Sequence, residues 1–336
     1  MNILPIIIAV VVLVSLILYA LMGGADFGAG MWAFLARGPG AYWQRHAISD
    51  AIAPIWEANH VWLILVVVLL FTGFPRAFSA MMIALHIPIA LMLVGIVLRG
   101  STFVFRKYDT RGAVVQRRWN LIFGIASFFT PFFQGVILGA LTTGQIHVTA
   151  SGQVLTGFFA GWLTPFALSC GLFALALFAF LAAVYMTHET RGDARLQNVF
   201  RLRALWAELA LAPLSLIVFL ASKSGAPSMY QGLTTWWAPL LLGWTALAST
   251  TAACALWLWK FELARIAGIA QVAFILIGWG IAQFPKLIEP DVTVYNSAAP
   301  DITLKLLTLA LGTGAIILLP SLLYLFHIFK GKPHRR

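Results

Sequence analysis

Nine long apolar runs, separated by short polar segments, limit most strongly what this chain can fold into. A helix that crosses a bilayer needs about 20 mainly apolar residues, and lipid offers no partners for an unpaired backbone. Only 10% of the 336 residues are charged, against about 25% in soluble domains. We therefore predict an all-α polytopic membrane protein that forms a single transmembrane domain over residues 1–336. This composition excludes a soluble domain carried on one anchor.

The apolar runs predict nine transmembrane helices near residues 3–35, 48–72, 77–98, 119–141, 154–186, 202–221, 238–260, 266–284 and 304–329. The first and fifth exceed the length needed to cross, so we expect them to tilt or to protrude into water. No Lys or Arg stands before Leu21, so the first run lacks the basic segment of a cleaved signal peptide. We expect this run to remain as the first span.

Basic residues gather in alternate loops and indicate the orientation of the chain. Of the 22 Lys and Arg residues, all but four share a side with the C-terminus, and the exceptions are Arg76, Lys223, Lys286 and Lys305. Cytoplasmic loops of membrane proteins carry such an excess. We predict the N-terminus outside and the C-terminus inside. The net charge of +11 then reflects topology and does not indicate nucleic-acid binding.

Two carboxylates lie within the apolar runs, Asp26 in the segment GADFGAG and Glu57 in the segment PIWEANHVW. A charged side chain in the bilayer core is costly, so it usually marks a path for an ion or a proton. If 48–72 is one helix, Glu57 lies about 10 Å deeper than Asp50 on the same face. We predict that Asp50, Asp26 and Glu57 form steps for protons from the cytoplasm to mid-membrane.

Structural roles for the same residues stay open at this point. Asp26 could cap a break in its glycine-rich helix, and Glu57 could pair with a buried Arg or His, with Arg99 the obvious candidate. Asn59 and His60 are further candidates for hydrogen bonds near the acids. The glycines around Asp26 are spaced for close helix contact, which by itself indicates packing.

His60 and His86 fall deep in the second and third predicted spans, at matched depths. Two histidines that face each other across helices can ligate heme iron, so this alternative stays open. Two separate hydrogen-bonded core histidines are the more ordinary outcome. Cys170 and Cys254 each stand alone in an apolar run, without a second ligand at metal spacing. The sequence therefore predicts no metal site and no disulfide.

The two acidic segments occur together with several others along the chain: GFPRAF from Gly73, LRGSTFVFR from Leu98, WLTPFAL from Trp162, Phe284-Pro285, and APDITL from Ala299. In this combination and order, the chain resembles subunit II of the cytochrome bd-type quinol oxidases from end to end. Some members read Asp-Gly-Asn-Gln where this chain reads Glu57-Ala-Asn-His60. In this departure the chain is similar to the cyanide-insensitive branch.

The resemblance implies a subunit of two four-helix bundles plus one extra helix, in the bacterial cytoplasmic (inner) membrane, that ligates no heme itself. Its partner would be subunit I of a terminal oxidase, which carries heme b and either heme d or a third heme b. That partner oxidises quinol on the outer side and reduces oxygen to water. Small accessory subunits, quinone and lipid are further partners that the resemblance allows.

The resemblance also implies roles for individual residues. Asp26 and Glu57 match acidic positions that line a cytoplasmic proton pathway along the subunit interface. Trp62 matches a tryptophan near the mouth of a hydrophobic oxygen channel. No catalytic residue and no metal ligand is implied in this chain.

A proton-coupled secondary transporter is the main alternative, because it also places acids at mid-membrane. Such a protein would hold a substrate cavity and act without a partner, but the sequence lacks a charged clamp for an ionic substrate. A purely structural assembly subunit, with acids that only pack, is the second alternative. A heme-rich companion of similar size would separate an oxidase subunit from a transporter.

Overall fold

The computed structural model describes residues 3–52, 56–108 and 113–330. Within these ranges, nine helices are long and apolar enough to cross a membrane, which confirms the predicted number. They are α1 (Leu4–Leu35), α3 (Trp56–Gly73), α5 (His86–Tyr108), α6 (Ala113–Ala140), α7 (Pro165–Glu189), α8 (Ala194–Gly225), α10 (Ala238–Trp257), α11 (Phe261–Gln283) and α12 (Asp301–Lys330). Short elements link them, namely α2 (Ala41–Ile52), α4 (Pro75–Ala84), α9 (Pro227–Gly232), β1 (Lys286–Ile288) and β2 (Val292–Thr293).

The nine helices form two bundles around two hydrophobic cores. The first core joins the N-terminal half of α1 to α3, α5 and α6, and the second joins α7, α8, α10 and α11 to the C-terminal half of α1. Helix α12 packs against α1 and α3, and none of its most apolar stretch is buried within this chain. Two four-helix bundles plus one extra helix are therefore confirmed.

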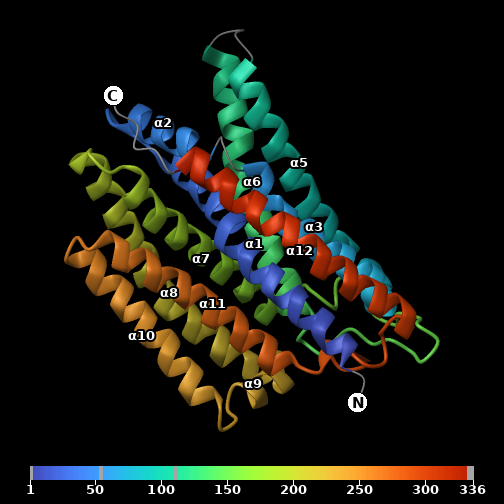
Figure 1. Cartoon of the computed structure of the whole chain (residues 1–336). Helices are drawn as coiled ribbons and strands as arrows, with labels where there is room; N and C mark the ends of the chain where they lie inside the picture. Colours follow the sequence, from blue (N-terminus) through green and yellow to red (C-terminus); the bar gives the residue numbers. More distant parts are fainter. Residues whose placement is uncertain (1–2, 53–55, 109–112, 331–336) are drawn as a thin grey trace.

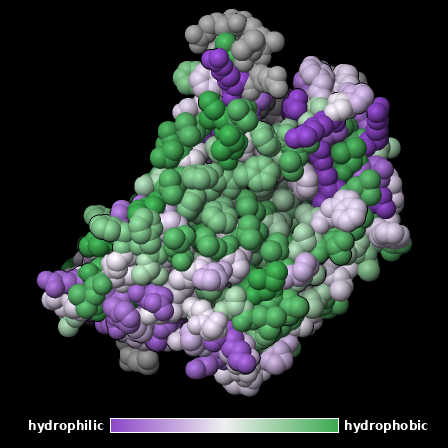
Figure 2. All heavy atoms as spheres, turned by 180° about the vertical axis from the view of Figure 1, so that it is seen from behind, coloured by the Kyte–Doolittle hydropathy of each residue, from purple (hydrophilic) through white to green (hydrophobic). Residues whose placement is uncertain are grey.

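The two ends of the molecule differ (Figure 1). We name them the α2 end, which also holds the last residues of α1, α7 and α12, and the hairpin end, which holds the N-terminus, β1 and β2. Figure 2 shows apolar side chains across the middle of one face, with hydrophilic residues gathered toward the two ends. This distribution matches the long helices, because only their middle sections would contact lipid tails.

The predicted span over 77–98 is wrong in its limits because the chain breaks near a proline. The predicted span over 48–72 corresponds to parts of α2 and α3, and residues 53–55 between them lie outside the described residues. The predicted span over 77–98 is divided at Leu85, so that α5 begins at His86 and extends to Tyr108. Pro88 lies in the first turn of α5, where its missing N–H leaves no helical hydrogen bond unmade.

The fifth predicted span, 154–186, is also wrong at its start. Helix α7 begins at Pro165, and the Thr164 hydroxyl caps it by accepting the Ala167 N–H (3.2 Å). A Thr cap followed by a proline is a strong start signal for a helix, and here it outweighs the apolar residues before it. The unusual length of the first span is confirmed, because α1 has 32 residues.

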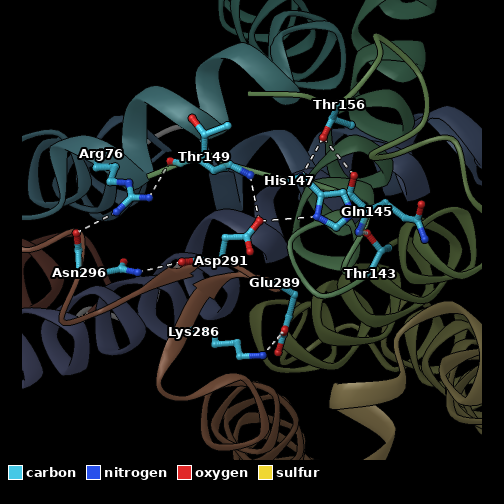
Figure 3. Close-up of polar contacts among 11 residues, drawn as sticks. Arg76, Thr143, Gln145, His147, Thr149, Thr156, Lys286, Glu289, Asp291 and Asn296 are labelled. Atoms are coloured by element: carbon cyan, nitrogen blue, oxygen red, sulfur yellow. Dashed lines mark hydrogen bonds and ion pairs between the residues drawn. The ribbon is translucent and has the colours of Figure 1, made fainter. Parts of the chain in front are cut away.

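A polar cap that the sequence did not predict closes the hairpin end of the first bundle (Figure 3). Strands β1 and β2 pair antiparallel, and the loop after α6 lies against them. Asp291 accepts the Val148 N–H (2.9 Å) and lies 3.6 Å from His147, and Arg76 donates to the Thr149 carbonyl (2.9 Å). The ion pair of Lys286 with Glu289 (2.5 Å) holds the hairpin itself.

Helices α1 and α7 approach each other closely along one face of α1. A Cβ on Gly24 would meet the Phe178 ring, and one on Gly28 would meet the Phe178 carbonyl and Ala182. One turn further on, the Trp32 indole N–H donates to the Ala179 carbonyl (2.7 Å). The predicted packing role of the glycines is therefore confirmed, since only residues without a side chain fit at 24 and 28.

Gly28→Ala should destabilise the protein by about 1–3 kcal/mol, because a methyl group at this position overlaps the backbone of α7. Thermal unfolding of the purified protein in detergent measures the loss. Gly243→Ala is the matched control, since a Cβ at this position in α10 meets nothing within 4 Å. Equal unfolding temperatures for the two variants would contradict the close contact.

Candidate functional site

Asp26 is the most buried carboxylate of the first bundle, at 5% exposure. It lies in α1 among glycines and alanines, so small neighbours leave room for partners from other helices. The Asn59 Nδ2 amide of α3 donates to the Asp26 carboxylate (2.8 Å), and Arg99 of α5 donates to the Asp26 backbone carbonyl (2.9 Å). Three helices of the first bundle thus meet at this residue.

Arg99 supplies the positive charge near this carboxylate. Its guanidinium is buried and attracts the Asp26 charge across the short gap between α5 and α1. The Phe27 and Phe123 rings lie 4.7 and 5.3 Å from the guanidinium carbon. Aromatic faces stabilise a cation where water is scarce, so Arg99 can remain charged beside Asp26. Asp26 therefore has an amide donor and a buried cation as its neighbours within apolar surroundings.

Asp50 and Glu57 are both exposed, on either side of residues 53–55. Asp50 belongs to α2, where it is exposed and accepts from His46 one turn earlier (2.8 Å). Glu57 lies in the first turn of α3 and is exposed on the outside of the chain. Residues 53–55 lie outside the described residues, so the step of about 10 Å from Asp50 to Glu57 stays a prediction. Of the three acids, only Asp26 lies inside the bundle.

His60 and Trp62 lie on α3, the helix whose Asn59 donates a hydrogen bond to Asp26. The His60 ring packs among the rings of Tyr19, Phe27 and Trp56, at centroid distances of 5.8, 5.8 and 6.2 Å. Trp62 is buried and belongs to the second core, which also contains side chains of α1 and α7. Both residues therefore occupy packed aromatic and apolar surroundings beside the acidic site.

The predicted match in depth between His60 and His86 is wrong. His86 is the first residue of α5 at the hairpin end, where its Nδ1–H donates to the Ile83 carbonyl (2.8 Å) and its ring contacts Phe158. His60 lies in the second turn of α3, which begins near the α2 end. The break at Leu85 moved His86 to a helix end, so these two histidines cannot face each other across one heme.

Sequence reasoning missed one buried acid, Glu208 of α8 in the second bundle. Its carboxylate accepts the Ser249 hydroxyl of α10 in a very short hydrogen bond, and the Gln271 amide of α11 (3.0 Å). The signal was the same as for Asp26, a single acid inside an apolar run. Both donors are neutral and lie in the second bundle, so Glu208 connects α8 to α10 and α11 within that bundle.

A cavity of about 140 Å³ adjoins the buried acid of the first bundle, and it is the second feature that the sequence did not reveal. Asp26 and Asn59 line it on one side, and Tyr185 and Glu189 of α7 line it on the other. Neither Asp50 nor Glu57 is part of its lining. Residues so far apart in the chain meet only because α1 packs against both α3 and α7.

Comparisons with known proteins agree along the whole chain. The family model of cytochrome bd terminal oxidase subunit II matches residues 4–329. A putative cytochrome bd menaquinol oxidase subunit II from Bacillus subtilis strain 168 is 25% identical over 325 residues, covering 93% of this chain and 91% of that relative. The cytochrome bd-I ubiquinol oxidase subunit 2 of Escherichia coli strain K12 is 26% identical over 355 residues, covering 92% and 89%.

A solved structure supports the same fold. The structure of bd oxidase from Geobacillus thermodenitrificans contains a chain that superposes with a TM-score of 0.77 at 23% identity. The superposition covers 99% of this chain and 100% of that one. The likeness extends over both bundles and the ninth helix.

Proposed function

This chain belongs to the family of cytochrome bd terminal oxidase subunit II, and we propose that it conducts protons from the cytoplasm toward the oxygen-reducing centre of such an oxidase. It is a multi-pass protein of the bacterial inner membrane and a subunit of a respiratory quinol oxidase. The buried Asp26 with its Asn59 and Arg99 partners is the observation that supports the proton role. The excess of basic residues in the loops at the α2 end supports a cytoplasmic position for this end.

The oxidase contains hemes, and we assign them to subunit I. In the described part of this chain, no group of three or more His, Cys, Asp or Glu side chains could hold a metal ion. The ring of His60 is enclosed by three aromatic side chains, and His86 lies at a helix end. Heme b and heme d, or a third heme b, supply the electron transfer and oxygen chemistry when bound in the partner. The residues of this chain supply protons.

Purification of this chain from its native membrane in mild detergent should bring a heme-rich polypeptide of similar size with it. Visible absorption spectra of the complex identify the hemes, and oxygen consumption with added quinol measures the activity. A colourless chain that acts without a partner would instead support the proton-coupled transporter.

The exposed position of Glu57 suggests how a proton leaves this chain. An acid on the surface of a membrane-spanning helix avoids lipid tails, so a partner or water must cover it. We place Glu57 at the contact with subunit I, two residues before Asn59, which donates to Asp26. Asp50, exposed on α2, collects protons at the cytoplasmic surface. Protons then pass Asp26 before they reach Glu57 and the neighbouring subunit.

Asp26→Asn and Glu57→Gln should each lower oxygen consumption of the purified complex by about 100-fold, because each removes a group that carries protons in turnover. Heme spectra should remain those of the parent complex, since the amides keep the size and most hydrogen bonds of the acids. Oxygen uptake and spectra are measured on the same sample.

Glu208→Gln is the matched control for these variants, because it also neutralises a buried acid but in the second bundle. It should leave turnover unchanged. Normal turnover in Glu57→Gln would remove this acid from the pathway. If Asp26→Asn loses the hemes together with the partner, its role is structural.

For oxygen, we propose that Trp62 borders an apolar route into the complex. Its ring is buried in the second core among side chains of α1 and α7. Molecular oxygen is apolar and dissolves better in such surroundings than in water, so packed apolar side chains can guide it through transient gaps.

Trp62→Phe should change the KM for oxygen several-fold while the KM for quinol stays the same, because a smaller ring widens only the oxygen route. Initial rates at stepped oxygen concentrations, with saturating quinol, provide the measurement. An unchanged KM for oxygen in a complex with intact heme spectra would exclude Trp62 from this route.

A further inference from the structure

We propose that protons reach Asp26 through the crevice between α1, α2, α3 and α7, and that Glu189 is the inlet of this crevice. The inference rests on the proposed function, because it names the side chains that feed the same buried acid. It assigns to α7 of the second bundle a role in proton supply. Sequence reasoning had placed the predicted proton steps on the first two spans.

The crevice has an acid at each end. Asp26 and Asn59 line it inside the bundle, and Glu189, the last residue of α7, lines it at the exposed α2 end. Tyr185 lies on α7 one turn before Glu189 and also lines the crevice. The side chains of Ala182, Tyr185 and Glu189 follow one face of α7, and Ala182 and Glu189 are about 10 Å apart along the axis. The distance from solvent to the inner end of the crevice is therefore short.

Small side chains create the space. Ala25 and Ala29 of α1, Ala51 of α2 and Ala182 of α7 line the walls between the polar ends. The cavity volume of about 140 Å³ exceeds the space of about 30 Å³ that one water molecule occupies in the liquid. Several water molecules fit, and the four polar side chains of the lining offer them hydrogen bonds.

The inner end of the crevice has an unmet hydrogen-bond acceptor. Asn59 is 1% exposed, and within the described part of the chain its Oδ1 atom has no hydrogen-bond partner, while its Nδ2 donates to Asp26. A buried carbonyl oxygen without a donor is costly, so a water molecule in the adjoining crevice is its natural partner. Such a water would stand beside the carboxylate of Asp26.

Proton transfer along this route requires only O–H bonds to break and form. The Glu189 carboxylate takes a proton from cytoplasmic water and passes it to the first water of the crevice. Each water, and the Tyr185 hydroxyl, then receives one proton and releases another. At the end, an O–H bond forms on the Asp26 carboxylate, and no electrons move in any step.

Two variants of the complete oxidase test the proposal by different means. Glu189→Gln removes the inlet acid, and Ala51→Leu narrows the crevice without changing any charge. Each should lower oxygen consumption by about 10-fold, since proton supply then limits turnover. Heme spectra should stay unchanged, and the solvent deuterium isotope effect on turnover should rise in both.

Each variant has a matched control. Glu262→Gln also removes an exposed acid at the α2 end, but from α11 and outside the crevice lining. Ala47→Leu adds the same bulk to α2 one turn before Ala51, again outside the lining. Both controls should retain the turnover and isotope effect of the parent complex.

The outcomes separate this inference from the function on which it rests. Normal turnover with a normal isotope effect in Glu189→Gln or in Ala51→Leu, with heme spectra intact, overturns the crevice route. If Asp26→Asn is slow in the same experiments, the proton role of this subunit stands without that inlet. If Asp26→Asn also turns over normally, the proposed function fails together with the inlet.

Discussion

The close contact between α1 and α7 is the constraint on which the rest of the structure depends. Gly24, Gly28 and Trp32 follow one face of α1, and each meets the backbone or a side chain of α7. In lipid, such packing replaces the hydrophobic effect as the force that joins helices. Because α1 holds both bundles through this contact, Asp26 lies between them, next to α3 on one side and near α7 on the other.

Two buried acids in this chain show two ways to place a carboxylate in hydrocarbon. Asp26 has an amide donor and a nearby arginine, and it adjoins a cavity. Glu208 has a serine and a glutamine as donors, both from the second bundle, and does not line that cavity. A proton carrier needs access to water and a charge that stabilises its ionised form, whereas a structural acid needs only donors. The different surroundings agree with the proton role that we propose for Asp26 and with a structural role for Glu208.

This chain is one subunit of a larger enzyme. Its exposed Glu57 and the unburied face of α12 indicate surfaces that are completed outside this chain. Membership in the subunit II family identifies the missing part as the other subunit of a quinol oxidase.

The sequence by itself determined the nine helices, because a backbone in lipid must satisfy its own hydrogen bonds, and it located Asp26 and Glu57 as costly charges. It did not determine where helices break. Hydropathy averages over about 20 residues, so the break at Leu85 and the start of α7 after Thr164 were missed. The break at Leu85 placed His86 at a helix end. Only the tertiary structure decided that Tyr185 and Glu189 lie near Asp26, because this proximity comes from the packing of distant helices and leaves no periodic signal in the chain.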